Sequence, residues 1–313
     1  MYFCCEKTKA KDTFLKRNPI PKGLIMVEKN FFEAKKSINI KGKLMDLTLP
    51  QVMGILNITP DSFYGNSRTK SVDEAVAKAE NFLNQGATFI DIGGYSSRPG
   101  AADVPVEEEI SRLIPVVEAL KKSLPEAVIS IDTFRAKVAE ECISAGAHVI
   151  NDISAGDLDA AMFETVAKLQ VPYIMMHMQG TPQNMQQHPF YQNVTLEVLD
   201  DLARKVAKLR SLKIHDVIID PGFGFGKTIN HNYQLLNELE AFQIFKLPVL
   251  VGFSRKGMIH KVLGNTAAEA LNGTSVLNTI ALQKGAGILR VHDVKEAVEC
   301  VRLVEKLKEV NHL

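Results

Sequence analysis

The stretch from Val217 to Lys227 joins the pattern of a buried strand to residues that can do chemistry. Its first residues, Val-Ile-Ile, are β-branched and apolar, which is typical of a strand buried on both faces, and the run ends at Asp220. A carboxylate there is unfavourable unless a partner pairs with it, and the glycines that follow let backbone approach a ligand. Lys227 adds a cation beside this anion. On its own, the stretch is also compatible with an aspartate that stabilises a turn.

The same arrangement recurs along the chain, and the recurrence indicates a shared site. Strand-like apolar runs elsewhere also end in polar side chains: Asn57, Asp91, Asp132, Asn151, His177 and Arg290. Each of these residues could be a separate turn-former. Their repetition is better explained by one site, because the ends of parallel strands meet at a single edge.

Eight strand candidates position these residues, and helical patterns separate them. The strands are predicted at 52–57, 88–92, 128–132, 148–152, 172–176, 216–220, 248–252 and 287–291. Capping-box spacings mark three helix starts, at Ser71–Glu74, Thr266–Glu269 and Asp293–Glu296. Eight β/α repeats over about 250 residues predict an α/β fold, a single (β/α)8 TIM barrel, with its active site at the C-terminal ends of the strands. A doubly wound open sheet is the alternative, but neither GxGxxG after the first strand nor GxxxxGK[ST] occurs.

The residues ahead of the first buried strand fall into two regions. Residues 1–36 have no apolar period and many lysines, so a poorly ordered basic arm is predicted there. Residues 37–49 alternate around Lys41–Lys43 as in a small β-hairpin, which would close the bottom of the barrel. The expected organisation is therefore an arm, 1–36, followed by one catalytic barrel domain, 37–313.

Charge and composition argue against several classes of partner. A net charge of +1 provides no strong field for nucleic acid or a membrane, although residues 1–45 hold 11 Lys/Arg and 4 Asp/Glu. No stretch has the length and apolar character of a signal peptide or membrane span. The four cysteines show no metal-binding spacing, which suggests a reducing compartment. We expect a cytoplasmic protein with no nucleic-acid and no membrane partner.

The loops after these strands carry an ordered set of motifs. They are MGILNITPDSF at 53–63, DIGGYSSRPG at 91–100, SIDT at 130–133, ND at 151–152, MHM at 176–178, SRKG at 254–257 and RVHD at 290–293. From about residue 38 to the C-terminus this set resembles the dihydropteroate synthases, a family of pterin-binding transferases in folate biosynthesis. No single motif is decisive, but the ordered set is specific. The resemblance implies that 6-hydroxymethyl-7,8-dihydropterin diphosphate is joined to 4-aminobenzoate, giving 7,8-dihydropteroate and diphosphate.

The resemblance also implies a role for each matching position. Pterin contacts are implied for Asp132, Asn151, Asp220, Lys256, Met176 and Phe225, although Met176 and Phe225 are equally compatible with the core. Diphosphate contacts are implied for Asn57, Arg290, His292 and Ser97, with Asn57 next to a Mg²⁺ cofactor. Two mobile loops would close over the aminobenzoate, which would meet Phe63, Ser97, Arg98, Pro99 and Arg255. Catalytic roles fall on Asp132, Asp220, Lys256 and Arg98, with the two aspartates stabilising a delocalised cation and Asp61 pairing with Arg98 on closure.

The sequence departs from the commoner family pattern at three positions. Tyr95 stands where Glu is usual, Ser97 where Thr is usual, and Gly257 where Ser is common. Ser97 keeps the hydroxyl, so activity is expected, while Tyr95 leaves loop electrostatics and the response to sulfonamides open. The family resemblance also implies a homodimer and a sulfonamide target. The apolar spacing of the last helix at 298–304 permits a dimer, but packing against the barrel explains that spacing equally well.

Two other functions are compatible with a pterin-binding barrel. One is a pterin-dependent methyltransferase, which has no diphosphate to bind, so the segments Ser254-Arg255-Lys256 and Arg290-Val291-His292 argue against it. The other is a non-catalytic pterin-binding paralogue, which would be expected to have lost diphosphate or loop residues. Those residues are all present in this chain.

Overall fold

The computed structural model describes residues 36–58, 68–96 and 103–310, without the side chains of 68–70. The arm predicted at 1–36 therefore lies outside the described residues except for Lys36. No helix among the described residues has the length and apolar character needed to cross a membrane.

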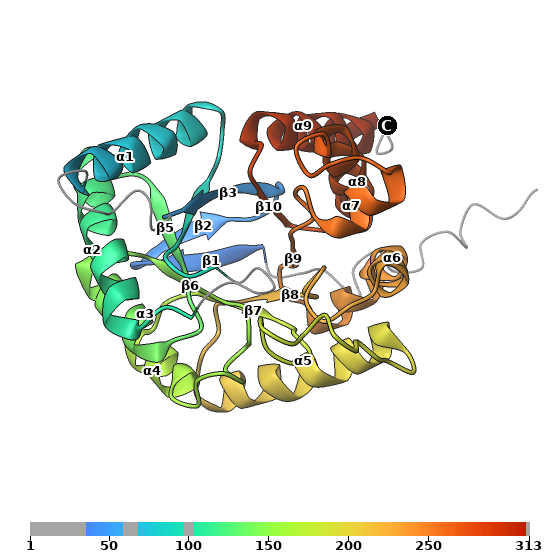
Figure 1. Ribbon diagram of the computed structural model, residues 1–313, viewed down its shortest axis with the longest axis horizontal. Helices are drawn as coiled ribbons and strands as arrows, with labels where there is room; N and C mark the ends of the chain where they lie inside the picture. Colours follow the sequence, from blue (N-terminus) through green and yellow to red (C-terminus); the bar gives the residue numbers. More distant parts are fainter. Residues whose placement is uncertain (1–35, 59–67, 97–102, 311–313) are drawn as a thin grey trace, which may run out of the picture. The chain divides into compact units, whose positions relative to one another are not determined.

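Eight parallel strands form a nearly closed barrel, as predicted (Figure 1). They are β3 Gln51–Asn57, β4 Phe89–Gly93, β5 Val128–Asp132, β6 Val149–Asp152, β7 Tyr173–Met176, β8 Val217–Asp220, β9 Leu250–Val251 and β10 Ile288–Val291. The order around the sheet is β8-β7-β6-β5-β4-β3-β10-β9. A parallel bridge between Ile219 and Val249 joins the two end strands. The open-sheet alternative is thereby excluded.

Helices surround the strands (Figure 1). They are α1 Arg68–Asn84, α2 Val106–Ser123, α3 Ala136–Ala145, α4 Met162–Leu169, α5 Val194–Ser211, α6 Ile229–Asn237, α7 Gly257–Leu263, α8 Leu271–Gln283 and α9 Val294–Val310. A 3₁₀ helix, Leu239–Phe245, follows α6. The short α7 is an addition to the β/α repeat in the loop between β9 and α8. The helix starts predicted at Ser71 and Thr266 are wrong, because α1 already begins at Arg68 and α8 begins only at Leu271.

The hydrophobic core has two layers because strand side chains alternate between the two faces of the sheet. The larger layer lies between strands and helices and includes Ile90, Ile92 and Ile131. The smaller one fills the lower barrel interior with one residue from each of seven strands: Met53, Phe89, Val149, Ile174, Ile218, Leu250 and Ile288. This layer leaves the opposite end of the barrel to polar side chains.

A β-hairpin closes the bottom of the barrel, as predicted. Strands β1 Ser37–Ile40 and β2 Lys43–Asp46 are antiparallel and joined by Lys41 and Gly42. Both turn residues have positive φ, which matches the right-handed twist of a two-residue hairpin. Ile38 is fully buried in the lower interior layer. The hairpin therefore seals the interior with apolar surface, and ligand access is confined to the other end.

Candidate functional site

The predicted polar strand ends lie at the same end of the barrel, the C-terminal end of its strands. Strand register places Asn57 beside Gly93, Gly93 beside Asp132, and Asp132 beside Asn151, so this row of neighbours crosses β3, β4, β5 and β6. On the other side of the barrel, Met176 of β7 pairs with Asp220 of β8. Parallel strands of matched register bring their C-terminal residues together, which is why residues 163 positions apart share this rim. The predicted convergence of these strand ends is confirmed.

An arginine from the last strand lies between two carboxylates in this mouth. Arg290 Nε is 2.6 Å from Asp91 Oδ2, and its Nη2 is 2.5 Å from Asp132 Oδ2. Burial would lower the pKa of Arg290, but the two carboxylates raise it above its ordinary value. Burial raises the pKa of Asp132 to about 7, with Arg290 opposing this shift and Asp91 adding to it. Arg290 is therefore a permanent cation.

Asp91 is the centre of this network, and the sequence prediction gave it no role. Its side chain is completely buried and accepts hydrogen bonds from Ser130 Oγ at 2.6 Å and Asn151 Nδ2 at 3.0 Å, besides that from Arg290. The signal was present in the sequence, since a charge at the middle of the buried run FIDIG requires a partner.

The loop after β8 holds Asp220 in place through its own backbone. Asp220 Oδ1 accepts the N–H of Gly222 at 2.7 Å, and burial raises the pKa of this carboxyl. Gly222 has φ +74°, and a Cβ there would lie 1.8 Å from the carbonyl oxygen of His177. Only glycine fits this approach. The Asp220 turn thus leaves Oδ2 as the oxygen available to a ligand.

Lys256 reaches the same loop from the other side. Its Nζ donates to the carbonyl of Phe223 at 2.6 Å and lies 4.7 Å from the centre of the Phe225 ring. Burial lowers the pKa of Lys256 to about 8, and Asp220 opposes this shift. Asp220 and Lys256 are therefore brought together as predicted.

Lys227 lies beneath the Asp220 loop, where it links the loop to β7. Its Nζ donates to the carbonyls of Gly222 at 3.0 Å and Phe225 at 3.1 Å and lies 2.9 Å from His177 Nδ1. Burial lowers the pKa of Lys227 to about 7 and that of His177 to about 2. All of these contacts are with other groups of the protein, so Lys227 and His177 stabilise the Asp220 loop.

His292 and Arg255 follow neighbouring strands but are held differently. His292 Nδ1 is 2.9 Å from Ser254 Oγ, and burial lowers the pKa of His292 to about 4, so the ring is neutral at pH 7. Arg255 forms a two-point ion pair with Asp293, at 2.9 Å for both Nε and Nη2, and its Nη1 donates to the carbonyl oxygens of residues 267 and 268. The expected contact of Arg255 with aminobenzoate stays a prediction.

Met176 and Phe225 are brought into one small apolar cluster near the mouth. Met176 is 4% exposed and belongs with Ile153 and two further methionines, and Phe225 is partly buried against them. Phe225 also carries Lys256 over its ring. The cluster forms an apolar wall beside the polar rim.

The remaining predicted site residues lie outside the described part of the chain. They are Asp61, Phe63, Ser97, Arg98 and Pro99. Tyr95 lies two residues before Ser97 in the chain. Its ring makes an edge-to-face contact with Phe134, with 5.1 Å between the ring centroids, and the guanidinium carbon of Arg135 lies 5.1 Å from the centre of the Tyr95 ring. Tyr95 Oη also accepts from Gln183 at 3.0 Å. The unusual tyrosine therefore joins three loops of the rim.

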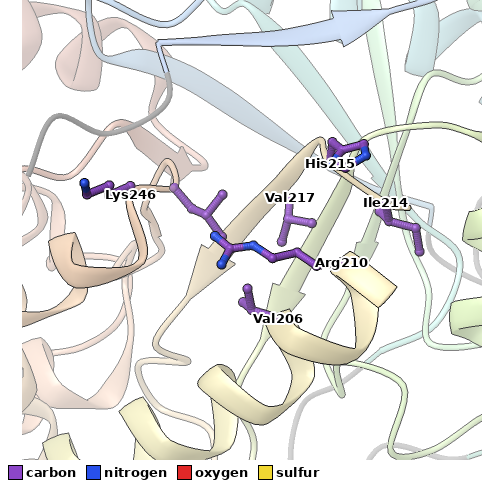
Figure 2. A pocket seen from close by; sticks show the side chains of 7 residues that line it. Val206, Arg210, Ile214, His215, Val217 and Lys246 are labelled. Atoms are coloured by element: carbon purple, nitrogen blue, oxygen red, sulfur yellow. The ribbon is translucent and has the colours of Figure 1, made fainter. Parts of the chain in front are cut away.

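Two hollows lie away from the buried carboxylates. One of about 300 Å³ is beside the start of β8, where Arg210 extends from α5 among Val206 and Val217 (Figure 2). Another of about 470 Å³ lies between the loop after β7 and α5, with Tyr191 and Asp201 in its wall. Neither contains Asp132, Asp220 or Arg290. The candidate site is therefore identified by its buried charged residues and not by the volume of a cavity.

Comparisons with known proteins match most of the chain. The family model described as "Pterin binding enzyme" matches residues 53–292. The dihydropteroate synthase of Escherichia coli K12 is 47% identical over 267 residues, covering 85% of this chain and 94% of that protein. The structure of Yersinia pestis dihydropteroate synthase with a sulfonamide drug complex is 42% identical with a TM-score of 0.81, covering 88% of this chain and 99% of that one. The Xanthomonas albilineans enzyme in complex with 7,8-dihydropteroate is 34% identical with a TM-score of 0.77, with coverages of 88% and 99%.

Proposed function

This chain belongs to the pterin-binding enzymes and, within them, to the dihydropteroate synthases, and from this premise we propose how its barrel mouth divides the work of that reaction. The enzyme is a transferase of folate synthesis. It joins 6-hydroxymethyl-7,8-dihydropterin diphosphate to 4-aminobenzoate, with release of diphosphate. One observation supports this assignment of roles above all others. Asp132, Asn151 and Asp220 lie at the C-terminal ends of their strands, and Arg290 forms ion pairs with Asp132 and Asp91 beside them.

The pterin is recognised by acceptors that face its donor edge. A pterin presents an amino group and a ring N–H side by side, and carboxylate or amide oxygens are suitable partners. Asp220 Oδ2 and Asn151 Oδ1 provide them, because Gly222 and Asp91 occupy their other polar atoms. Lys256 supplies a cation for the carbonyl side of the ring, and Met176 with Phe225 covers its face. A ligand that lacks these donors leaves buried acceptors unpaired and is rejected.

The diphosphate is held by Arg290 and His292. Arg290 keeps its charge at every physiological pH and forms forked contacts with phosphate oxygens. Ser254 Oγ accepts the backbone N–H of His292 at 3.2 Å and lies 2.9 Å from His292 Nδ1. We assign the hydroxyl proton to the contact with Nδ1, which places the ring proton of the neutral histidine on Nε2 as a donor to phosphate. Ser97 is proposed as a further contact.

The donors at this rim fit a Mg²⁺ ion that arrives with the diphosphate. Asn57 is exposed at the end of β3, and a Cβ at Gly93 would lie 3.7 Å from Asn57 Oδ1 and 3.6 Å from Asp132 Oδ2, so two oxygen donors share one patch of the rim. The described residues contain no group of three His, Cys, Asp or Glu side chains for a metal. Mg²⁺ needs only one or two protein oxygens when phosphates supply others. When bound, it neutralises charge on the leaving diphosphate.

Asp132 and Asp220 stabilise the reacting carbon. Departure of diphosphate leaves positive charge that the electron-rich pterin delocalises, and fixed carboxylates beside it lower the energy of that state. The aniline nitrogen of aminobenzoate is nucleophilic while neutral, so no general base and no covalent enzyme intermediate is required. Lys256 and Arg98 complete the proposed catalytic set.

The aminobenzoate binds above the pterin, between the two segments that contain Phe63 and Pro99. Ser97, Arg98 and Arg255 are proposed at its carboxylate end. The Yersinia pestis enzyme was solved with a sulfonamide drug complex, and this supports sulfonamides as ligands of the same place here.

The helices α7, α8 and α9 are proposed to form the interface of a homodimer. Val276 of α8 and Leu303 and Leu307 of α9 are 49%, 73% and 48% exposed, while Val304 is buried against the barrel. Barrel packing thus explains Val304 and leaves Leu303 facing outward. Apolar side chains exposed on adjacent helices favour a partner surface. A cytoplasmic location is proposed as well.

Diphosphate release tests the function directly. We expect release to require the pterin diphosphate, 4-aminobenzoate and Mg²⁺ together, because the proposed sites are all needed for transfer. Release that continued without aminobenzoate would indicate a hydrolase, and pterin binding without any release would indicate the non-catalytic paralogue. The methyltransferase alternative predicts no requirement for a diphosphate ester.

A further inference from the structure

Asp91 is positioned to control the site without touching any ligand. It is 0% exposed on β4, and its partners come from three other strands: Ser130 on β5, Asn151 on β6 and Arg290 on β10. Both carboxylate oxygens are occupied by these donors. A residue enclosed in this way acts on substrate only through the groups it holds.

The carboxylate fixes which end of the Asn151 amide faces the mouth. An ionised carboxylate only accepts hydrogen bonds, so Asn151 has to direct Nδ2 toward Asp91 Oδ2, at 3.0 Å. The reverse orientation would place two acceptors against each other inside the protein. Asn151 Oδ1 then remains as the outward atom, and it makes no hydrogen bond to another described residue. Asp91 thereby turns an ambiguous amide into a defined acceptor.

The same carboxylate holds Arg290 from the side. Its contact is with Nε, at 2.6 Å, whereas Asp132 contacts Nη2. Because Nε is the atom nearest the aliphatic stem, Asp91 fixes the plane of the guanidinium, and Nη1 is left as the nitrogen with no hydrogen-bond partner among the described residues. One buried group therefore orients both an acceptor for the pterin and a cation for the diphosphate.

We propose that Asp91 is a positioning residue that sets the hydrogen-bond polarity of the pterin pocket, so that the pocket selects a heterocycle with adjacent N–H donors. This inference rests on the proposed function of the mouth. It assigns the choice between an amino group and an oxo group at the pyrimidine edge to a residue that lies behind the pocket wall.

The test compares two ligands in Asp91→Asn. The probes are 2-amino-4-oxopteridine and its 2-oxo counterpart, which replaces the amino donor by an acceptor, each titrated without diphosphate. We expect the unaltered enzyme to prefer the amino compound at least tenfold. In Asp91→Asn the new amide can donate to Asn151 Oδ1, so affinity for the amino compound should fall at least tenfold and the preference should approach one.

Asp152→Asn is the matched control. Asp152 is also 0% exposed on the next position of β6, but its oxygens accept from Tyr173 Oη at 2.6 Å and from the turn at Ser154, on the other face of the strand. Its loss should reduce thermal stability while the ratio of the two affinities stays unchanged. A purely structural effect of Asp91 would likewise leave this ratio unchanged.

If Asp91→Asn does not fold, a double variant that exchanges the residues at positions 91 and 151 provides the test. In Asp91→Asn/Asn151→Asp the pair regains a donor and an acceptor, the net charge is unaltered, and position 151 again presents an acceptor outward. Recovery of the preference for the amino compound supports the inference, and a swapped variant that folds but shows no preference overturns it. An Asp91→Asn variant that keeps the preference also overturns it. If the unaltered enzyme binds neither pteridine, the proposed function itself fails, which is a separate outcome.

Discussion

Replacing Asp220 by Asn preserves the shape of the side chain and reverses its polarity toward the ligand. In the native enzyme Oδ1 accepts the Gly222 N–H at 2.7 Å, so Oδ2 faces the pterin. In Asp220→Asn the remaining oxygen keeps Gly222, and the NH₂ group is directed at a ligand N–H. Two donors then face each other in a buried place, which costs about 1–3 kcal/mol, or roughly 5- to 150-fold in pterin affinity.

The transition state loses more than the ground state. The carboxylate charge opposes the positive charge that develops as diphosphate leaves, and this interaction exists only in the transition state. We therefore expect kcat/KM for the pterin diphosphate to fall at least about a hundredfold, with part of the loss in kcat. Lys256 provides a second readout. Burial lowers its pKa to about 8 against the opposing charge of Asp220, so losing that charge lowers its pKa further. The alkaline limb of the kcat/KM profile should move to lower pH.

Steady-state kinetics with both substrates and a thermal melt decide the matter. Burial raises the pKa of Asp220, which means that the fold disfavours its charge, so Asp220→Asn should melt no lower than the native enzyme. Asp152→Asn is the control. Both oxygens of Asp152 accept hydrogen bonds, from Ser154 and from Tyr173, so an amide places a donor against a buried donor, and the variant should lose stability but keep the KM for pterin. The KM for aminobenzoate should barely change in Asp220→Asn. A raised KM for aminobenzoate with intact pterin affinity would show that the substrates are oriented the other way in the barrel.

Three further changes test other parts of the structure. Arg290→Ala should weaken diphosphate binding by about 1.5–3 kcal/mol. It should also lower the melting temperature, because Asp91 stays buried without its cation. Calorimetry with free diphosphate measures the first effect, and unaltered affinity would contradict the assignment of Arg290 to the diphosphate site. Lys227→Met should abolish a pH dependence of stability. Burial lowers the folded-state pKa of Lys227 from 10.5 to about 7, so the unfolded chain binds more protons than the folded one between these pH values. The free energy of unfolding of the native enzyme therefore rises with pH in that window, by up to about 1.4 kcal/mol per pH unit. Denaturant titrations of the native enzyme and of Lys227→Met at pH 7 and 10 would show whether this difference exists. Removal of residues 1–36 should leave turnover within about twofold, and a large loss in a folded protein would show that the arm completes the enzyme.

The fold was predictable because its signals are local and repeated. Each barrel strand is a short apolar run, and the observed strands begin and end within two residues of their predicted bounds. Helix starts were less certain, since a capping-box spacing does not say what else competes for the carboxylate. Asp293 directly precedes α9 as predicted, but its carboxylate is bound to Arg255 across the β9–α8 loop. Such long-range partners are not encoded in spacing along one segment.

The rim was predictable for the same reason, while its supporting residues were not. Strand ends mark Asp132, Asn151 and Asp220 as residues that face a ligand, because polar side chains at these positions need an explanation. Whether such an amide or carboxylate presents a donor or an acceptor is decided by its other neighbour, which is Asp91 for Asn151 and the Gly222 N–H for Asp220.

Asp91 is 60 residues from Asn151 in the sequence, whereas Gly222 is two residues from Asp220. Only folding brings Asp91 next to Asn151. The near neighbour is enforced by glycine, since a Cβ at Gly222 would collide with His177. The distant one depends on register, because β5 lies between β4 and β6, and a one-residue slip would turn Asp91 to the other face. The choice between amino and oxo groups is therefore a property of barrel register as much as of the residues that meet the pterin.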